Sequence, residues 1–197
     1  MYKIYSTKGF IVDKKDHGSD NLSYLIFSEK FGFISAKAYS VRSEKSKMSN
    51  FLQSMNLCNL SLTKGKGGWV ITGGNLIDSI YYNYGKEAAS VFTKVLNLMY
   101  RLSIKEEAQA RLFKTLEKSA DFLSLNKENS QEYTSELDIF LHINLLDDFG
   151  YLNKNQIERG VGYNIVDSGF NFEMINKIKE NKDFLTKKIN ESLLEIH

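Results

Sequence analysis

The hydrophobic periodicity of this 197-residue chain changes near Tyr84 and Gly85, and that change constrains the fold more than any other feature. Before it, short apolar segments rich in β-branched and aromatic residues alternate as strands do. After it, apolar residues recur with the three- and four-residue spacing of a helix face. The chain contains no proline, so the change of period alone marks the boundary. We therefore predict an α+β protein with a β domain over residues 1–84 and a helical domain over residues 85–197.

Five strands are expected in the first domain, each closed by Gly, Asn, Asp or Ser, which favour turns. A tight break at residues 29–32 predicts a hairpin between the second and third strands, and KGKGG at residues 64–68 joins the last two. Short strands at such regular spacing are typical of a small barrel. The predicted strands span residues 4–12, 21–29, 33–39, 57–65 and 68–82.

A helical bundle is expected in the second domain. Ser103, followed three residues later by Glu106, has the capping-box pattern and predicts the start of the second helix there. Gly150 follows the third apolar segment, where it predicts a helix C-cap. The segments with helical spacing span residues 88–102, 112–123, 137–145 and 171–196.

Composition places the chain among globular proteins. It is 42% hydrophobic and 25% charged, close to the average of folded domains. No apolar run approaches the roughly 18 residues of a membrane span, and the N-terminus lacks the apolar core of a secretory signal. The single cysteine, Cys58, excludes an intramolecular disulfide and a multi-cysteine zinc site. A cytoplasmic protein is therefore expected.

The charge is unevenly distributed along the chain. Residues 1–84 carry 11 Lys and Arg against 6 Asp and Glu, a net charge of +5. Residues 85–197 carry 15 against 18, a net charge of −3. A basic part joined to a mildly acidic part indicates a polyanion-binding module on a scaffold.

The segment FISAKAYSVRSEKSKM, residues 33–48, starts as a strand and then gathers cations and serines around a single acid. Such cations neutralise phosphates, hydroxyls bond phosphate oxygens, and nearby aromatic rings offer stacking surfaces to bases. A five-stranded barrel with this loop favours an OB-fold, which binds nucleic acid on one sheet face and its adjoining loops. A charged loop without a ligand fits the same residues. The candidate nucleic-acid-binding residues are Lys37, Tyr39, Arg42, Lys45, Lys47, Lys14, Lys15, Lys64, Lys66 and Tyr24, with Phe33 as a further stacking ring.

Other candidate sites favour structural interpretations. KGKGG lacks the Gly-Lys-Ser/Thr ending and the following helix of a phosphate-binding loop, so we interpret it as a hairpin turn. His17, His142 and His197 have no partners at metal-ligand or triad spacing, and Cys58 is expected to be a small buried residue. Asp147 and Asp148 are interpreted as a solvated corner at a helix end. We expect no enzyme.

Several motifs resemble the bacterial recombination mediator family RecO. They are GFIV at residues 9–12, SEKFG at 28–32, and the basic loop that begins with AKAY at 36–39 and continues through Arg42 to KSK at 45–47. LTKGKGGWVITGGNLIDS, at residues 62–79, continues the N-terminal pattern. RLFKTLEKSADFLS at 111–124 and INLLDDFGYL at 143–152 resemble the helical domain of that family. The resemblance covers roughly residues 4–152 and depends on the order and spacing of the motifs together.

The resemblance implies an OB-fold domain followed by a helical domain that together bind single- and double-stranded DNA. It further implies strand annealing, and cooperation with RecR and single-stranded-DNA-binding protein in loading RecA, without catalysis. Three positions depart from the family. No cysteine follows Tyr151, so no zinc or other cofactor is expected. Ile139 and Phe140 occupy positions where the family commonly has basic residues. The contact with single-stranded-DNA-binding protein that the family implies is therefore not assigned to these two residues. Ala38 replaces a glycine that is usual in the basic loop.

We therefore expect a non-catalytic, DNA-binding recombination mediator in DNA repair. Two alternatives remain open at the level of sequence: an OB-fold module that binds RNA, and a protein-interaction module whose helical bundle is the working surface. Competition between matched DNA and RNA strands would distinguish the first alternative from DNA binding. Measuring DNA binding at about 0.1 M salt would test the second alternative.

Overall fold

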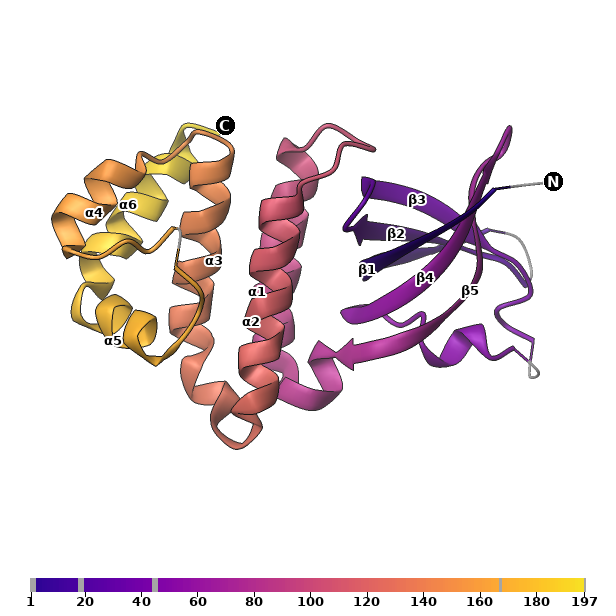
Figure 1. Ribbon diagram of the computed structural model, residues 1–197, viewed down its shortest axis with the longest axis horizontal. Coiled ribbons are helices and arrows are strands. Elements are labelled where there is room, and N and C mark those ends of the chain that lie inside the picture. The colour runs from indigo at the N-terminus through magenta and orange to yellow at the C-terminus, as the bar shows by residue number, and fades with distance from the viewer. Residues whose placement is uncertain (1–2, 18–19, 44–45, 167, 197) are drawn as a thin grey trace.

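The computed structural model describes residues 3–17, 20–43, 46–166 and 168–196. A β-barrel occupies one end of the molecule, helices α1 (Ile80–Leu102) and α2 (Ala110–Leu125) lie in the middle, and the remaining helices form the other end (Figure 1). These three regions therefore follow one another in space as they do along the chain. No described helix combines the length and the apolar character that crossing a membrane requires.

The barrel consists of five strands that close in the order β1-β2-β3-β5-β4. Every neighbouring pair is antiparallel except β3 and β5, which pair in parallel at Ala36–Trp69 and Lys37–Val70. Closure leaves no free sheet edge. The predicted five-stranded barrel is thus confirmed. Its strands are β1 (Ile4–Asp16), β2 (Leu22–Ser28), β3 (Gly32–Ala38), β4 (Asn56–Gly65) and β5 (Gly68–Ser79).

The last strand ends earlier than the sequence pattern predicts. Strand β5 stops at Ser79, and helix α1 (Ile80–Leu102) begins at the next residue. The Asp78 carboxylate accepts hydrogen bonds from the Ser79 N–H at 2.8 Å, the Asn83 amide at 2.6 Å and the Tyr84 hydroxyl at 2.7 Å. These bonds fix the first helical turn, so the aromatic residues after Ser79 belong to a helix and not to the strand. Gly85, with φ 89°, then kinks α1.

Three of the predicted helical segments lie within helices of the structure, and the tail from Asn171 forms two helices. The helix over Lys154–Val161 was not predicted. Gly150 has φ 76° just after α3, and the Tyr151 N–H bonds the Leu146 carbonyl at 2.8 Å, as expected at a helix C-terminus. The remaining helices are α2 (Ala110–Leu125), α3 (Thr134–Asp148), α4 (Lys154–Val161), α5 (Phe172–Glu180) and α6 (Lys182–Leu194), with short 3-10 helices η1 (Met48–Asn50) and η2 (Lys127–Tyr133).

The predicted capping box at Ser103 and Glu106 is wrong. Ser103 closes α1 instead of opening α2, because its hydroxyl donates to the Met99 carbonyl at 2.6 Å. Glu106 has φ 60° and lies in the α1–α2 linker, where its N–H donates to the Phe33 carbonyl of β3 at 3.1 Å. The linker therefore attaches the helices to the barrel.

The barrel has two hydrophobic cores. Its interior is filled by residues such as Ile11, Ile26 and Ile71, which belong to one buried cluster. The end that faces the helices contributes to a second cluster, shared with α1 and α2. In this shared core the ring of Phe113 lies 5.6 Å from the rings of both Phe10 and Phe27, measured between centroids. The barrel and the helices are thus packed against each other through aromatic side chains.

Candidate nucleic-acid interface

Strand register places two of the candidate lysines on one outer face of the barrel. Lys15 of β1 pairs with Ser23 of β2, Ser23 pairs with Lys37 of β3, and Lys37 pairs with Val70 of β5. Cross-strand partners point to the same side of a sheet, so Lys15 and Lys37 share the outer face. This row crosses four strands of the barrel, and it is the structural basis of the candidate site.

A cavity of about 560 Å³ joins the end of β3 to the β4–β5 turn. Lys37 and Tyr39 line one side of it, and Lys66 lines the other together with the glycines of the turn. Tyr39 is 50% exposed, so its ring is accessible. Three of the candidate residues, separated by up to 29 positions in the chain, thus meet at one surface. The KGKGG turn itself is confirmed as a hairpin, with Gly65 paired to Gly68.

A second hollow, of about 500 Å³, lies where the β1–β2 and β3–β4 connections meet. Lys14, Tyr24 and Arg42 line it. Arg42 forms an ion pair with Asp16, and the Lys14 ammonium donates to the Gln53 side chain at 3.1 Å. The charge of Arg42 is therefore partly neutralised by a neighbouring carboxylate, which weakens its expected role.

The other cations differ in their availability. Within the described part of the chain, Lys15, Lys37, Lys47 and Lys66 form no ion pair. Lys64 is instead held by Glu106, with 2.5 Å between the ammonium and the carboxylate, and lies 4.9 Å from the centroid of the Trp69 ring. Hydrogen bonding from Lys64 lowers the pKa of Glu106. Lys45 lies outside the described residues.

Two of the expected stacking rings are corrected by the structure. Tyr24 is 1% exposed and Phe33 is 2% exposed, because both side chains point into hydrophobic cores. Burial raises the pKa of the Tyr24 hydroxyl. A base cannot stack on either ring in this fold, so Tyr39 is the stacking candidate that remains from the sequence.

The structural interpretation of Cys58, His142 and His17 agrees with the positions of these residues in the fold. Cys58 is fully buried, burial raises the pKa of its thiol to about 12, and its sulfur donates to the Phe51 carbonyl. His142 lies on α3 with Nδ1 3.1 Å from the Asp138 carboxylate. His17 is exposed in the β1–β2 connection, and His197 lies outside the described residues. Across the described ranges, no three His, Cys, Asp or Glu side chains are grouped so that they could hold a metal ion.

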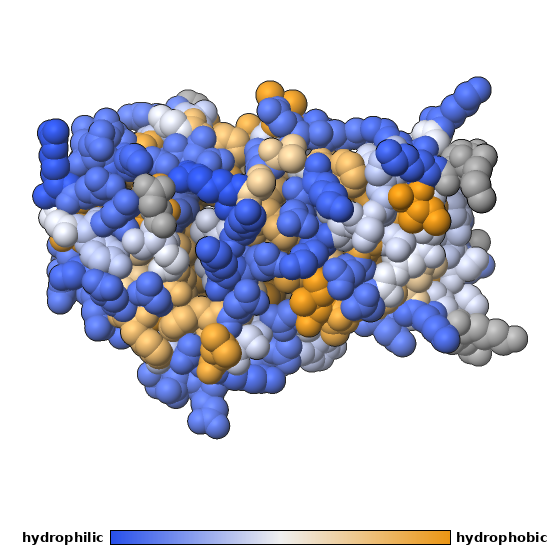
Figure 2. Space-filling model, viewed as in Figure 1, coloured by the Kyte–Doolittle hydropathy of each residue, from blue (hydrophilic) through white to orange (hydrophobic). Residues whose placement is uncertain are grey.

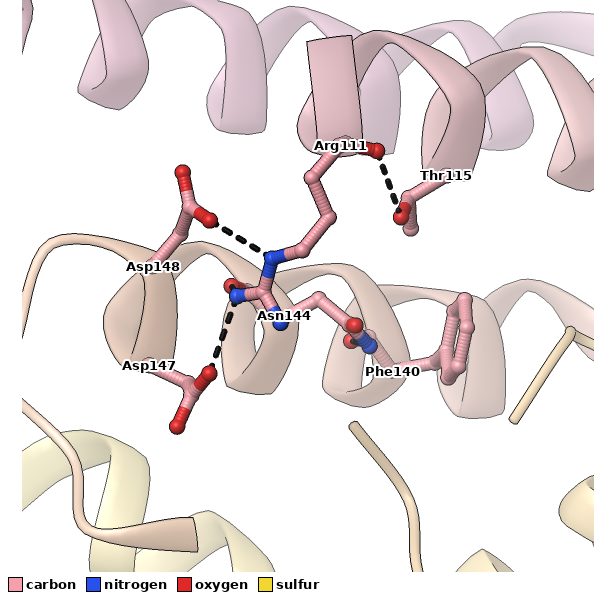
Figure 3. A network of polar contacts seen from close by, with 6 residues as sticks. All are labelled: Arg111, Thr115, Phe140, Asn144, Asp147 and Asp148. Atoms are coloured by element: carbon pink, nitrogen blue, oxygen red, sulfur yellow. Dashed lines mark hydrogen bonds and ion pairs between the residues drawn. The ribbon is translucent and has the colours of Figure 1, made fainter. Parts of the chain in front are cut away.

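The acidic pair at the end of α3 is not a solvated corner. Arg111 of α2 bonds Asp148 through Nε at 2.6 Å and Asp147 through a terminal nitrogen at 2.9 Å (Figure 3). The same nitrogen donates to the Asn144 carbonyl at 3.2 Å. One guanidinium thus neutralises two carboxylates that would be unfavourable at a helix C-terminus. This network joins α2 to α3, and the spacing in the sequence does not reveal it.

A closed five-stranded barrel with lysines on its outer face, followed by helices, defines an OB-fold protein with a helical extension. Residues 1–80 match the family model described as Recombination protein O N terminal. The DNA repair protein RecO of Dehalococcoides mccartyi strain CBDB1 is 30% identical over 149 residues, which make up 75% of this chain and 56% of that protein. The RecO of strain BAV1 of that species matches with the same identity and coverage.

The barrel therefore belongs to the RecO N-terminal domain family, and the chain is a relative of RecO. This confirms the resemblance seen in the sequence motifs. The match of 149 residues is longer than the barrel, so the similarity continues into the helices. The chain spans about half the length of the curated relatives it matches.

Proposed function

We propose that this protein is a non-catalytic DNA-binding recombination mediator in DNA repair. The observation that carries the proposal is the meeting of Lys37, Tyr39 and Lys66 around one accessible cavity of the barrel. An OB-fold uses the same region, its second and third strands and the loops beside them, to bind nucleic acid. The relatedness to proteins named DNA repair protein RecO supports the biological role.

The proposed mechanism is electrostatic. Lys15, Lys37 and Lys66 contact phosphate oxygens and release counterions, which supplies affinity without reading the sequence. Lys47, which is exposed in the chain segment after β3, supplies a further cation. Tyr39 offers one ring face to an unpaired base. Neutralising two complementary strands on one surface lowers their mutual repulsion, and annealing follows from that.

Domain roles and partners are part of the same proposal. Residues 1–84 act as the nucleic-acid-binding domain and residues 85–197 as the helical domain. The family resemblance supports RecR and single-stranded-DNA-binding protein as partners, and RecA loading at single-stranded gaps as the outcome. The segment from Asn153 to Gly169, which has no cysteine, packs as an apolar part of the helical core through Ile157, Ile165 and Val166.

The experiment is a binding titration with a single-stranded deoxyoligonucleotide longer than roughly 16 nucleotides, the upper site size of one OB-fold. Replacing both Lys37 and Lys66 by alanine should weaken binding at about 0.1 M salt by about tenfold or more, since each lysine that is removed no longer releases a counterion from a phosphate. A matched variant with Lys179 and Lys182 replaced by alanine, two exposed lysines of the helical part, should bind like the wild type.

The same titration distinguishes the alternatives. A wild-type chain that binds neither single- nor double-stranded DNA at this salt concentration would contradict the proposal and favour a protein-interaction module. Clear preference for a matched RNA strand in competition would favour RNA as the ligand. Equal weakening in the barrel and helical variants would show that the barrel cavity has no special role.

A further inference from the structure

Two adjacent tyrosines at the start of α1 are exposed to solvent. Tyr81 is 52% exposed and Tyr82 is 78% exposed, although both are large aromatic residues. Their rings lie 5.7 Å apart at an interplanar angle of 89°. The helix directs Ile80 and Tyr84 inward, and the Asp78 hydrogen bonds fix this turn, so the two tyrosines face outward. The structure thus holds two accessible aromatic rings in place.

The tyrosines line a groove between the start of β4 and helix α1. Its volume is about 550 Å³, and Lys86 and Lys94 line it with them. Ser54, Ser90, Thr93 and Asn97 supply polar groups, and no carboxylate belongs to its described lining. Lys94 also lines a neighbouring hollow together with Asp138, so we take Lys86 as the cation of the tyrosine groove. The Glu87 carboxylate lies beside Gly85 and is not part of this lining.

This groove adjoins the second hollow of the barrel. Gln53 lines both the tyrosine groove and the hollow that contains Lys14 and Arg42. Its carbonyl oxygen accepts from Lys14, and its amide donates to the Ser49 carbonyl at 2.6 Å, which fixes the side chain between the two. A strand that leaves the barrel loops along this side therefore arrives at the tyrosines.

The chemistry of the groove fits a single-stranded nucleic acid. Aromatic faces, a lysine and neutral hydroxyls are the combination that holds unpaired bases and their phosphates. Figure 2 shows hydrophobic residues exposed between the helices and the barrel, with hydrophilic residues around them. A duplex has its bases stacked and paired, so it could use the lysines of this surface but not the rings.

We propose that Tyr81 and Tyr82, with Lys86, form a base-stacking site that extends the barrel surface for single-stranded DNA. The proposal rests on the function above, because the barrel cations bring the strand to the groove. These rings take the place of Tyr24 and Phe33, which the sequence pattern indicated for stacking and which are buried. The expected contribution is about 5- to 150-fold in affinity for each stacked base.

The experiment compares single-stranded and double-stranded DNA binding of the full chain with both tyrosines replaced by alanine. Single-stranded affinity should fall by about fivefold or more, and duplex affinity should change by less than about twofold. Replacing both tyrosines by phenylalanine should retain wild-type binding, because the ring face is kept and only the hydroxyl is removed. A control with Leu125, which is 86% exposed on α2, replaced by alanine should also bind normally.

Photocrosslinking supplies a direct readout. A single-stranded oligonucleotide that carries halogenated pyrimidines should crosslink to Tyr81 or Tyr82, as located by mass spectrometry. If the alanine variant binds single-stranded DNA as tightly as the wild type, the stacking site is wrong. The proposed function would still stand in that case, because the wild type binds DNA. Equal weakening for single and double strands would also overturn it. Absence of DNA binding by the wild type would overturn both proposals.

Discussion

The barrel and the helical part use their charges differently. In the helical part, ion pairs tie charges together, as in the Arg111 network and the pairs Lys177–Glu180 and Lys188–Glu191. On the outer face of the barrel, Lys15, Lys37 and Lys66 form no ion pair within the described ranges. The outer face of the barrel therefore keeps these three lysines available for a polyanion, although Arg42 and Lys64 are paired, whereas Arg111 uses its charge to join α2 to α3.

This difference separates two kinds of substitution. Changes at paired charges of the helices beyond α1, such as Arg111, should alter stability and leave DNA affinity unchanged. Changes at lysines of the barrel face should alter DNA affinity and leave stability nearly unchanged, because exposed lysines contribute little to folding. The boundary between the two parts should show both effects, since the α1–α2 linker contacts the barrel.

The greatest decrease in stability is expected in the core that both parts share. Replacing Phe113 by alanine should reduce the free energy of unfolding by about 3–5 kcal/mol, because the fully buried ring contacts Phe10 and Phe27 of the barrel. Urea unfolding should be followed by far-UV circular dichroism for the helices and by fluorescence of Trp69, the single tryptophan, for the barrel. Both signals should shift together.

A tryptophan transition that keeps its wild-type midpoint would show that the barrel is stable without the helices. The matched control replaces the exposed Leu125 by alanine, which should change stability by less than about 0.5 kcal/mol.

An intermediate effect is expected at the Arg111 network. Replacing Arg111 by alanine leaves Asp147 and Asp148 unpaired at the C-terminus of α3 and should cost about 1–2 kcal/mol, after allowance for a guanidinium side chain that is 39% exposed. Adding Asp148→Asn should recover part of that stability in the same urea titration. Single-stranded DNA affinity should stay within about twofold of the wild type. A large decrease in affinity would place DNA contacts on α2 or α3 and contradict this prediction.

A still smaller effect is expected at Glu106, which holds Lys64. The pKa of Glu106 in the folded protein is lowered from its ordinary value near 4.5 by the hydrogen bond from Lys64, so its contribution to stability is present above that value. The contribution disappears as the pH falls through the lower, folded pKa. Glu106→Gln should therefore cost less than about 1 kcal/mol near neutral pH, and the difference from the wild type should vanish in acid.

The same variant releases Lys64 from its carboxylate, so it should raise DNA affinity slightly. Urea unfolding at a series of pH values and one DNA titration measure both outcomes. If the difference in the free energy of unfolding between Glu106→Gln and the wild type grows as the pH falls, the assigned ion pair is wrong.

The fold could be predicted from the sequence where local pattern decides it. The five strands and the helical segments follow from alternation and from three- and four-residue spacing. The errors lie where a single polar contact overrides the pattern. Asp78 ends β5 at Ser79, although the next residues favour a strand, and Ser103 bonds backward to Met99 instead of capping α2.

The candidate site was less predictable, because exposure depends on register and tertiary packing. The pattern of cations correctly indicated a basic part of the chain, but it could not show that Glu106 holds Lys64 or that Asp16 holds Arg42. Alternation placed Tyr24 on one face with Leu22 and Ile26, but it did not show whether that face lies inside the barrel. Tyr24 and Phe33 are buried. Tyr81 and Tyr82 are exposed, because they lie on helix α1 and not on the strand that the sequence predicts.

The salt dependence of DNA binding shows whether the barrel face holds phosphates. For a single strand, each phosphate that a lysine neutralises contributes about 0.7 to the slope of log affinity against log salt concentration. We expect that replacing Lys37 and Lys66 by alanine flattens the slope by about 1.4, while replacing Lys179 and Lys182 leaves it unchanged. A slope that is the same in the wild type and in the Lys37 and Lys66 variant would contradict the assignment of the barrel face as the phosphate-binding surface.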